Sequence, residues 1–477
     1  MCGRKNTIIL VMLSCQTKQI NFYSCCKKIR FRCNKKKPYS ISVIGSPAFI
    51  LAAIGLKNVG YGVWLRKFSH ICAPIEHNLM CLLFQFLFWG AVFALFHSYV
   101  LYPWLLRYWA RGRQLNDLTF SRHDENLPYI IVMMAAYNEG KIIEQKLKSV
   151  FDTDYPDDQF EVIIGSDGST DNTDSIVQQY TEQHDNLLLT RFEGRNGKSN
   201  ILNQLMERYG TAICSFGCDC LLVLTDANVL FTRATLYELA KHFKNPDIGV
   251  VGSFVYNPNA QNRGIALQEN AYISRENDIK YLEGLVSGTM MGAFGACYAL
   301  RANLFVPIPP NFLMEDFYLT MCALEKGKKA IAEPKAICHE AIPDEVSVEF
   351  KRKKRISAGN FQNLRRFAAL LLPARNGVWF AFWSHKVLRW LGPFFILTAL
   401  ASSAYLAQTS IFYRVLLAVQ LALLLLPALD WLLRQCHLHN RWLRLGSYFY
   451  LMNWALLAGF WQYLRGVKTN AWSPPQR

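Results

Sequence analysis

The stretch Leu221–Asn228, LLVLTDAN, predicts how the middle of this chain folds. Its apolar residues lead into a threonine, an aspartate, an alanine and an asparagine, a pattern typical of a buried parallel strand that ends on a carboxylate. In open α/β sheets, ligands bind beyond the carboxyl ends of the strands. An acid there, followed two residues later by an amide oxygen, suits a divalent cation that holds phosphates. The alternative is an ordinary strand with a capped turn, because Asp and Asn are also good turn and N-cap residues.

Strand and helix patterns alternate on both sides of this stretch. Buried-strand patterns occur at 129–136 (YIIVMMAA), 160–167 (FEVIIGSD) and 186–191, and a helical pattern follows each of them. Strands that alternate with helices at this spacing imply βαβ units and a mostly parallel sheet. We therefore predict a doubly wound α/β domain over residues 125–345.

Most of the positive charge lies outside this domain. The formal net charge is +17 at pH 7, and residues 1–78 hold thirteen Lys or Arg against one acid, Glu76, which makes +12 of that total. A nearly neutral catalytic region flanked by basic residues does not require a nucleic-acid partner, and we expect none. The fourteen cysteines do not form two spaced pairs of zinc ligands, so free thiols in a reducing compartment are expected.

Residues 1–78 form a basic, cysteine-rich extension for which two alternatives stay open. It could be a native segment, or an artefactual upstream extension of a protein that starts near Met80, directly before the run CLLFQFLFWGAVFALF. The apolar stretch Ile41–Leu56 is interrupted by glycine and proline and is short for a membrane span.

Residues 79–106 are the first stretch that is long and apolar enough to cross a membrane. Aromatic residues gather at its trailing end, and Arg107, Arg111 and Arg113 follow, so the positive-inside rule places the next segment in the cytoplasm. We therefore predict an integral protein of the cell inner or plasma membrane with a cytoplasmic catalytic domain.

The C-terminal third is expected to return to the membrane. Residues 346–386 look helical and contain KRKKR at 351–355, which favours basic helices that lie at the cytoplasmic interface. Three apolar stretches follow, each predicted to be a transmembrane helix: residues 387–406, 411–433 and 445–464. The topology of the last of these is left open, because an outside C-terminus would carry Arg465 and Lys468.

Acidic residues mark four points at or just after the predicted strand ends or in loops of the α/β domain. They are Glu139, Asp167, Asp226 and the adjacent pair Glu315–Asp316. Successive strand ends of a doubly wound sheet converge on one crevice, so residues far apart in sequence can share a site. A crevice lined with acids suits phosphate that is bridged by Mg²⁺ or Mn²⁺.

Five motifs occur in the order found in family 2 glycosyltransferases. They are AAYNE at 135–139, SDGSTDNT at 166–173, GRNGKSNILN at 194–203, TDAN at 225–228 and MED at 314–316. Over residues 79–470 the chain resembles the membrane-embedded branch of that family, which includes cellulose, hyaluronan and poly-N-acetylglucosamine synthases. The resemblance implies a GT-A type nucleotide-sugar-binding domain, with one transmembrane helix before it and about three after it.

The resemblance also implies a donor site made by the first three motifs. Ala136, Tyr137 and Glu139 would line the base and ribose of the nucleotide. Asp167 would bind the uracil end of a UDP-sugar, and Lys198 would help to hold the nucleotide.

A metal and a sugar site are implied next to the donor. Asp226 would be the metal-binding acid of a D-x-D motif, with Asn228 as the second ligand, and the ion would be Mg²⁺ or Mn²⁺. The segment that begins at Gly288 and ends at Gly295 would let the backbone approach the sugar closely, as glycine permits.

The pair Glu315–Asp316 would carry the catalysis. Asp316 would be the general base that deprotonates an acceptor hydroxyl, and Glu315 would orient that base or contact the acceptor. Attack on the anomeric carbon from the face opposite the nucleotide implies an inverting transfer with UDP as the leaving group, to a saccharide or lipid-linked acceptor.

Two departures from the family pattern change these expectations. Asn228 stands where the second acid of D-x-D is usual, so metal affinity should be lower although metal use should survive. Arg352 and Arg355 keep the basic pair of the Q/R-x-x-R-W motif, but the tryptophan is Ile356, so a stacking platform for an acceptor sugar is lost. This favours transfer of one or a few sugars over processive polymerisation. Gln362, seven residues after Arg355, could face the same site or not.

Alternative interpretations remain for the activity and for single residues. A transferase of the dolichol-phosphate type, which moves a sugar onto a polyprenyl phosphate, would use the same donor fold, and a non-catalytic membrane scaffold is the third possibility. Asp171 and Asp174 are better interpreted as N-cap or first-turn acids than as catalytic groups. A structural role is also favoured for His339.

Overall fold

The computed structural model describes residues 42–46, 49–53, 61–215, 220–257, 266–341, 346–373, 377–436, 438 and 440–470. The chain divides into two compact units, Met1–Met80 and Cys81–Arg477. In the first unit, β1 (Ser42–Ser46) and β2 (Phe49–Ala53) form an antiparallel pair. The apolar stretch 41–56, judged too short for a span, therefore contains two short strands; the question of an upstream start lies mostly outside the described residues.

The second unit contains an eight-stranded sheet with the order β5-β4-β3-β6-β9-β8-β10-β7. Six of these strands run in one direction, while β9 and β7 are antiparallel to their neighbours. The sheet is therefore mixed but mostly parallel, as predicted. Its strands are β3 (Ile130–Ala136), β4 (Phe160–Asp167), β5 (Leu187–Phe192), β6 (Leu221–Asp226), β7 (Val229–Phe231), β8 (Ile248–Tyr256), β9 (Cys297–Arg301) and β10 (Lys329–Glu340).

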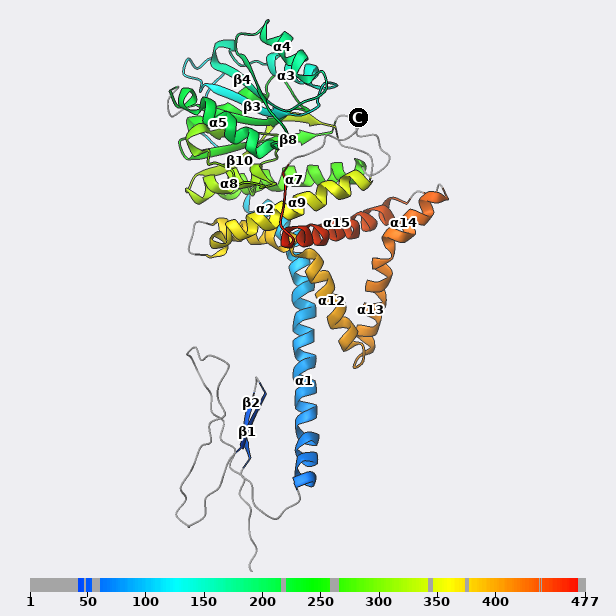
Figure 1. Cartoon of the computed structure of the whole chain (residues 1–477). Helices are drawn as coiled ribbons and strands as arrows, with labels where there is room; N and C mark the ends of the chain where they lie inside the picture. Colours follow the sequence, from blue (N-terminus) through cyan, green and yellow to red (C-terminus); the bar gives the residue numbers. More distant parts are fainter. Residues whose placement is uncertain are drawn as a thin grey trace, which may run out of the picture. The chain divides into compact units, whose positions relative to one another are not determined.

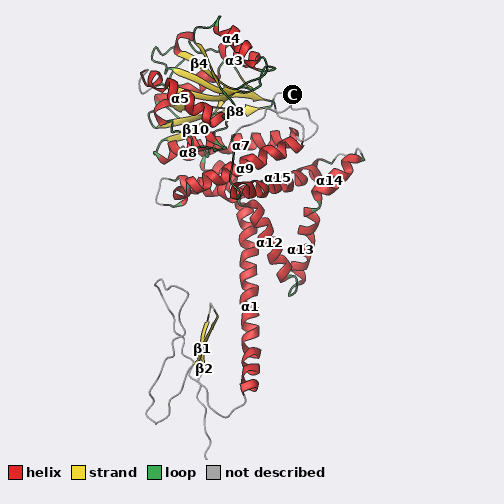
Figure 2. Cartoon of the chain, in the orientation of Figure 1, coloured by secondary structure: helices red, strands yellow, loops and turns green. Residues whose placement is uncertain are grey.

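Helices cover both faces of this sheet, because the central strands are apolar on both sides (Figure 2). Along β3, alternate residues point to opposite faces: Ile131 and Met133 belong to one hydrophobic core, and Val132 and Met134 to the other. The first core includes α5 (Lys198–Ser215) and α8 (Glu315–Glu325). The second includes α3 (Ile143–Phe151), α4 (Thr173–Thr181) and α6 (Thr235–Ala240). The long helix α7 (Ala266–Ser287) packs along β10 and β8.

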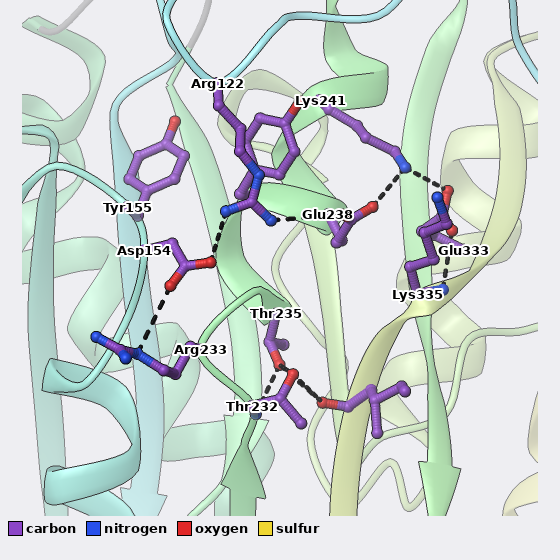
Figure 3. A network of polar contacts seen from close by, with 12 residues as sticks. Arg122, Asp154, Tyr155, Thr232, Arg233, Thr235, Glu238, Lys241, Glu333 and Lys335 are labelled. Carbon is purple, nitrogen blue, oxygen red and sulfur yellow. Dashed lines mark hydrogen bonds and ion pairs between the residues drawn. The ribbon is translucent and has the colours of Figure 1, made fainter.

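Ion pairs link α6 to the loops and strands around it (Figure 3). Lys241 bridges Glu238 at 2.5 Å and Glu333 of β10 at 3.0 Å. Arg122 bridges Asp154 at 2.5 Å and Glu238 at 3.8 Å. These side chains are paired with one another, so the network holds the second face of the domain together.

Apolar helices extend from this domain. Residues 77–109, which comprise most of α1 (Tyr61–Phe96), a π-helical turn (His97–Leu101) and α2 (Tyr102–Trp109), form one helix that is long and apolar enough to cross a membrane. Two bent pairs would meet the same criterion if each were a single span: Val378–Trp390 with α12 (Gly392–Leu406), bent by 64°, and α13 (Ile411–Leu424) with α14 (Leu426–Gln435), bent by 41°. Each second helix has a proline in its first turn, which explains the bend.

Helix α1 packs against the hairpin of α12 and α13. Phe84 stacks on Tyr405 with 4.2 Å between the ring centroids, and the ring of Phe88 meets that of Tyr413 edge-on at 5.5 Å. Large apolar side chains on the other faces, such as Phe86 (77% exposed), are not covered by the residues that the structure describes. Uncovered apolar surface of this size suits a lipid environment.

The basic helix α9 (Val346–Arg366) lies beside α15 (Arg441–Leu464) (Figure 1). Ser357 donates a hydrogen bond of 2.8 Å to the carbonyl oxygen of Leu456, and a Cβ on Gly459 would lie only 2.4 Å from Ser357 Cβ. Within the described residues, α15 does not meet the length and hydropathy criterion that residues 77–109 meet. The predicted span over 445–464 therefore stays a prediction.

Candidate functional site

Three of the predicted positions meet at the carboxyl edge of the sheet. Asp226 ends β6, Lys198 begins α5 and Glu315 begins α8. The ammonium of Lys198 lies 2.5 Å from Asp226 Oδ1 and 2.6 Å from Glu315 Oε1. Burial by itself would lower the pKa of Lys198, but the two carboxylates outweigh burial and raise that pKa well above its ordinary value. The motifs GRNGK, TDAN and MED therefore form one charged cluster.

Asp316 lies next to this cluster and is almost entirely buried. Its Oδ1 accepts a hydrogen bond of 2.7 Å from the amide of Phe317. Burial and then the neighbouring Glu315 raise the pKa of Asp316 to about 6, while Lys198 acts in the opposite direction. A carboxyl with a pKa near the working pH is suited to accept a proton from a hydroxyl group.

The backbone comes close to this acid at Gly295. A Cβ there would lie 3.0 Å from Asp316 Oδ2, so a larger residue would displace the acid. The carbonyl oxygen of Gly295 also accepts a long hydrogen bond of 3.5 Å from Lys198. The next residue, Ala296, accepts the amide of Asp226 at 3.1 Å. The segment before β9 thus joins the metal-binding candidate to the base candidate.

Gly288, at the other end of the same segment, is not brought to the site. It adopts a positive φ of 66° and lies against Lys329, at the start of β10. That start is the amino-terminal edge of the parallel strands, whereas Asp226 lies at the carboxyl edge. The close approach predicted for glycine in this segment is made by Gly295 instead.

Asp167 supports the loop before α5. Its carboxylate is fully buried and accepts the amides of Asn196 at 2.6 Å and Gly197 at 3.0 Å, and Arg195 Nε lies 3.4 Å away. The guanidinium of Arg195 lies 3.1 Å from the centroid of the Tyr137 ring. The structure therefore connects Asp167 to Lys198 through the loop, and contact with a nucleotide base stays a prediction.

The loop after β3 is held by the turn after β4. Ala136 and Glu139 are buried, and Glu139 N donates to Thr173 Oγ1 at 2.8 Å. Asp171 accepts the amide of Gly140 at 3.0 Å and that of Thr173 at 3.0 Å. Asp171 therefore has the structural role expected for a turn acid. The loop lies at the same sheet edge as Asp226, because Ala135 pairs with Asp226.

The basic helix α9 reaches the same region. Arg352 lies 3.9 Å from Glu340 and 3.6 Å from Glu349. Burial opposes its charge, but these two acids and, more weakly, Asp226 raise the pKa of Arg352 above its ordinary value. Arg352 is therefore within electrostatic reach of the metal-binding candidate. Arg355 is partly exposed on the same helix.

Gln362 forms hydrogen bonds with the loop that leads into the MED motif. Its amide nitrogen donates to the carbonyl of Asn311 at 3.0 Å, and its oxygen accepts the amide of Leu313 at 3.2 Å. Gly359, one turn earlier, lies so close that a Cβ would be 2.5 Å from Met314 Cγ. Helix α9 thus positions the MED motif, a role that the spacing of Gln362 from Arg355 did not indicate.

A divalent cation fits the donor set at the end of β6 only together with a ligand that supplies further oxygens. Asp226 is about one third exposed, and Asn228 follows it in a partly exposed turn. Among the described residues, no group of three or more His, Cys, Asp or Glu could hold a metal ion. Mg²⁺ and Mn²⁺ are commonly held by one or two protein oxygens plus substrate phosphates and water, which is the arrangement these residues allow.

The pKa of Asp316 leads to a first prediction. If Asp316 is the general base, its ionised form is the active one, and kcat/KM should rise about tenfold per pH unit below pH 6 and level off above it. Stability should change in the opposite direction. The carboxyl of Asp316 binds its proton more tightly in the folded chain than in the unfolded chain, where its pKa is 3.8. The free energy of unfolding should therefore fall as pH rises from 3.8 to about 6. Initial rates from pH 5 to 8 test this, and a rate that stays constant down to pH 5 would contradict it.

Family comparisons agree with the motifs. The model described as Glycosyl transferase family 2 matches residues 131–305, and the model described as Glycosyl transferase family group 2 matches residues 221–462, half of the chain. The chain belongs to glycosyltransferase family 2. It is therefore a glycosyltransferase, and the resemblance stated from the five motifs is confirmed.

Relatives and solved structures add detail. The chain is 26% identical over 244 residues to the poly-beta-1,6-N-acetyl-D-glucosamine synthase of Staphylococcus epidermidis, covering 50% of this chain and 56% of that one. The same synthase from Staphylococcus aureus (strain COL) is 26% identical over 251 residues, 51% of this chain and 57% of that one. The chain thus spans somewhat more than half the length of these relatives.

A mannosyltransferase from Pyrobaculum calidifontis, solved in complex with GDP-Man and Mn²⁺, has a similar fold. The TM-score is 0.59 at 22% identity, over 81% of this chain and 99% of that one. The GT-A type fold predicted from the sequence is therefore confirmed.

Proposed function

We propose that this glycosyltransferase moves a sugar, with inversion, from a nucleotide-sugar to a hydroxyl group of a saccharide or lipid-linked acceptor. The observation that carries the proposal is the position of Asp316: a buried carboxyl with a pKa of about 6, adjacent to the Lys198–Asp226–Glu315 cluster at the strand ends. That arrangement combines a base with a phosphate-binding environment in one crevice.

Asp316 would accept the proton of the acceptor hydroxyl as its oxygen attacks the anomeric carbon. The bond from that carbon to the nucleotide breaks on the opposite face, so the anomeric configuration inverts. Lys198 would lie near the diphosphate that leaves, because it pairs with Asp226 at 2.5 Å. Glu315, which shares Lys198, would keep the start of α8 in place.

Asp226 and Asn228 would hold the metal ion, together with oxygens from the donor diphosphate. When bound, Mg²⁺ or Mn²⁺ supplies Lewis-acid stabilisation of the leaving group. Lys198 and Arg352 both place positive charge near Asp226, which suits a site whose second metal ligand is a neutral amide. A UDP-sugar is the expected donor, because the resemblance assigns Asp167 and its loop to a uracil base.

Asn228→Asp provides the second prediction. A carboxylate adds one negative charge beside Asp226, so the Mn²⁺ concentration for half-maximal activity should fall about tenfold, and the variant should keep its activity at a higher chelator concentration than the natural chain does. Activity measured against free Mn²⁺ tests this. Asn172→Asp, in the turn before α4, is the control that adds the same charge elsewhere. An unchanged metal dependence would make Asn228 a turn residue only.

We propose that the chain is an integral membrane protein with its catalytic domain on the cytoplasmic side, at the inner or plasma membrane. Residues 77–109 supply the length and hydropathy, and the arginines at 107, 111 and 113 follow the positive-inside rule. Helices α9 and α15 would lie together at the interface, because α9 is basic and α15 packs along it. This differs from the expectation of a third C-terminal span.

A polyprenyl phosphate acceptor is the second candidate, since a basic α9 that positions the MED loop suits a lipid phosphate. The test is a screen for nucleoside diphosphate release with purified protein and UDP-glucose, UDP-N-acetylglucosamine and GDP-mannose, with and without Mn²⁺. Radiolabelled sugar should then appear in aqueous saccharide or in a lipid-linked saccharide; label bound directly to a polyprenyl phosphate would favour the polyprenyl acceptor. Release from none of the donors would contradict the proposed function.

A further inference from the structure

Asp316, the candidate base, has a second lysine near it besides Lys198. Lys280, on α7, is 4% exposed, and its ammonium lies 3.2 Å from the centroid of the Phe294 ring. Phe294 directly precedes Gly295, which lies against Asp316. Asp316 is subject to the charges of both lysines, Lys198 and Lys280. Lys280 therefore lies near the candidate base, beside the segment that carries Gly295.

Within the described part of the chain, the Lys280 ammonium makes no hydrogen bond and no ion pair. The acids on either side of it along α7 are already used. Glu276 pairs with Lys386 at 3.0 Å and also with His385 and Arg389. Glu283 accepts from Tyr102 at 2.9 Å and from the amide of Met291 at 2.9 Å.

An ammonium group has three donors, and burying it without an acceptor is costly. Burial and then the neighbouring Lys386 lower the pKa of Lys280 to about 7, while Glu276, Asp316 and Glu283 act in the opposite direction. The other fully buried lysine, Lys146, differs: it donates to Thr225 Oγ1 at 3.1 Å and to the carbonyl of Val229 at 2.6 Å. A buried lysine without acceptors indicates that the ligand brings them.

We propose that Lys280 and Phe294 form an acceptor subsite for an oxyanion, so that the sugar receiving the glycosyl group carries a phosphate or a carboxylate near its reacting hydroxyl. Lys280 would contact the oxyanion, and Phe294 would pack against the sugar ring or the lysine stem. This subsite rests on the proposed function, because it takes Asp316 as the base. A phosphate would come from a phosphorylated or lipid-phosphate-linked sugar, and a carboxylate from a uronic acid.

Thermal unfolding of the full-length protein in detergent, with UDP and Mn²⁺, tests the subsite. Glucose, glucose 6-phosphate and glucuronate are the probes. One or both anionic probes should bind the natural chain at least about tenfold more tightly than glucose, as a charge-assisted contact implies. The preferred anion distinguishes phosphate from carboxylate. In Lys280→Met the anionic preference should disappear, and in Lys280→Arg it should persist in part.

Stability separates this role from a packing role. Lys280→Met should have a Tm no lower than the natural chain, because it removes an unpaired buried cation, whereas Lys146→Met should lower Tm by leaving two buried acceptors unpaired. The proposal is wrong if the natural chain binds all three probes equally, or if Lys280→Met keeps the preference. If Lys280→Met only shifted the acid limb of kcat/KM and kept the anionic preference, Lys280 would tune the pKa of Asp316, and the proposal would be wrong. Absence of any Tm increase with UDP and Mn²⁺ would instead count against the proposed function.

Discussion

Replacing Asp316 by asparagine should lower the rate of sugar transfer about 100- to 10,000-fold. Asparagine keeps the size of the side chain and can still accept the amide of Phe317, which bonds to Oδ1 at 2.7 Å. It cannot accept the proton of the attacking hydroxyl, so the loss should fall on kcat rather than on donor binding. The measurement is a single-turnover assay of nucleoside diphosphate release, with the donor Kd determined separately by calorimetry.

Two variants serve as controls for Asp316→Asn. Asp154→Asn removes a carboxylate that pairs with Arg122 and Arg233 in the ion-pair network beside α6 (Figure 3), and it should transfer sugar at the natural rate. Glu315→Gln keeps the base but weakens the contact to Lys198, which is 2.6 Å long, so a smaller loss is expected. If Asp316→Asn transferred sugar as fast as the natural chain, another group would be the base.

The strands β3 to β6 could be predicted because their side chains are apolar on both faces of the sheet. The predicted strands at 129–136, 160–167 and 186–191 correspond to β3, β4 and β5, and LLVLTD is β6. The direction of β9 could not be predicted, since the same short apolar run can enter a sheet from either end. Its antiparallel insertion between β6 and β8 is determined by the crossing segment 288–296, whose path depends on tertiary contacts such as Met291 to Glu283.

The site was predictable where a motif lies at a strand or helix end, and less so elsewhere. Asp226, Lys198 and Glu315–Asp316 meet because topology brings these ends to one edge. Gly288 does not reach this edge, because a Gly-rich segment has no periodicity that indicates which of its glycines lies at the site. Gln362 and Lys280 contact loops outside their own helices, at Asn311 and Phe294, and no spacing rule encodes such contacts.

Replacing Lys198 by methionine should produce the second large effect. It should weaken donor binding and also raise the pKa of Asp316. Its ammonium is the shared counterion of Asp226 and Glu315, at 2.5 and 2.6 Å. Without it the donor diphosphate would meet uncompensated carboxylates, so donor Kd should rise about 10- to 100-fold. Lys198 also lowers the pKa of Asp316, so its loss should move the acid limb of kcat/KM above pH 6.

The variant should also be less stable, by about 1–3 kcal/mol, because an unpaired buried carboxylate costs its desolvation energy. The lower part of that range is expected, since Asp226 is about one third exposed and therefore partly screened by solvent. Lys198→Arg keeps the charge and should restore most of the stability and the position of the acid limb.

Lys241→Met is the matched control, and it separates the two parts of this prediction. Lys241 also bridges two carboxylates, Glu238 at 2.5 Å and Glu333 at 3.0 Å, and its exposure is close to that of Lys198 (15% against 17%). Losing it should lower Tm by a similar amount, but donor Kd and the acid limb should not change, because that network lies on α6 and β10. If both variants weakened donor binding equally, the effect of Lys198 would be one of folding. A loss of donor affinity confined to Lys198→Met would mean that the counterion of the strand-end acids is also a binding group for the phosphates.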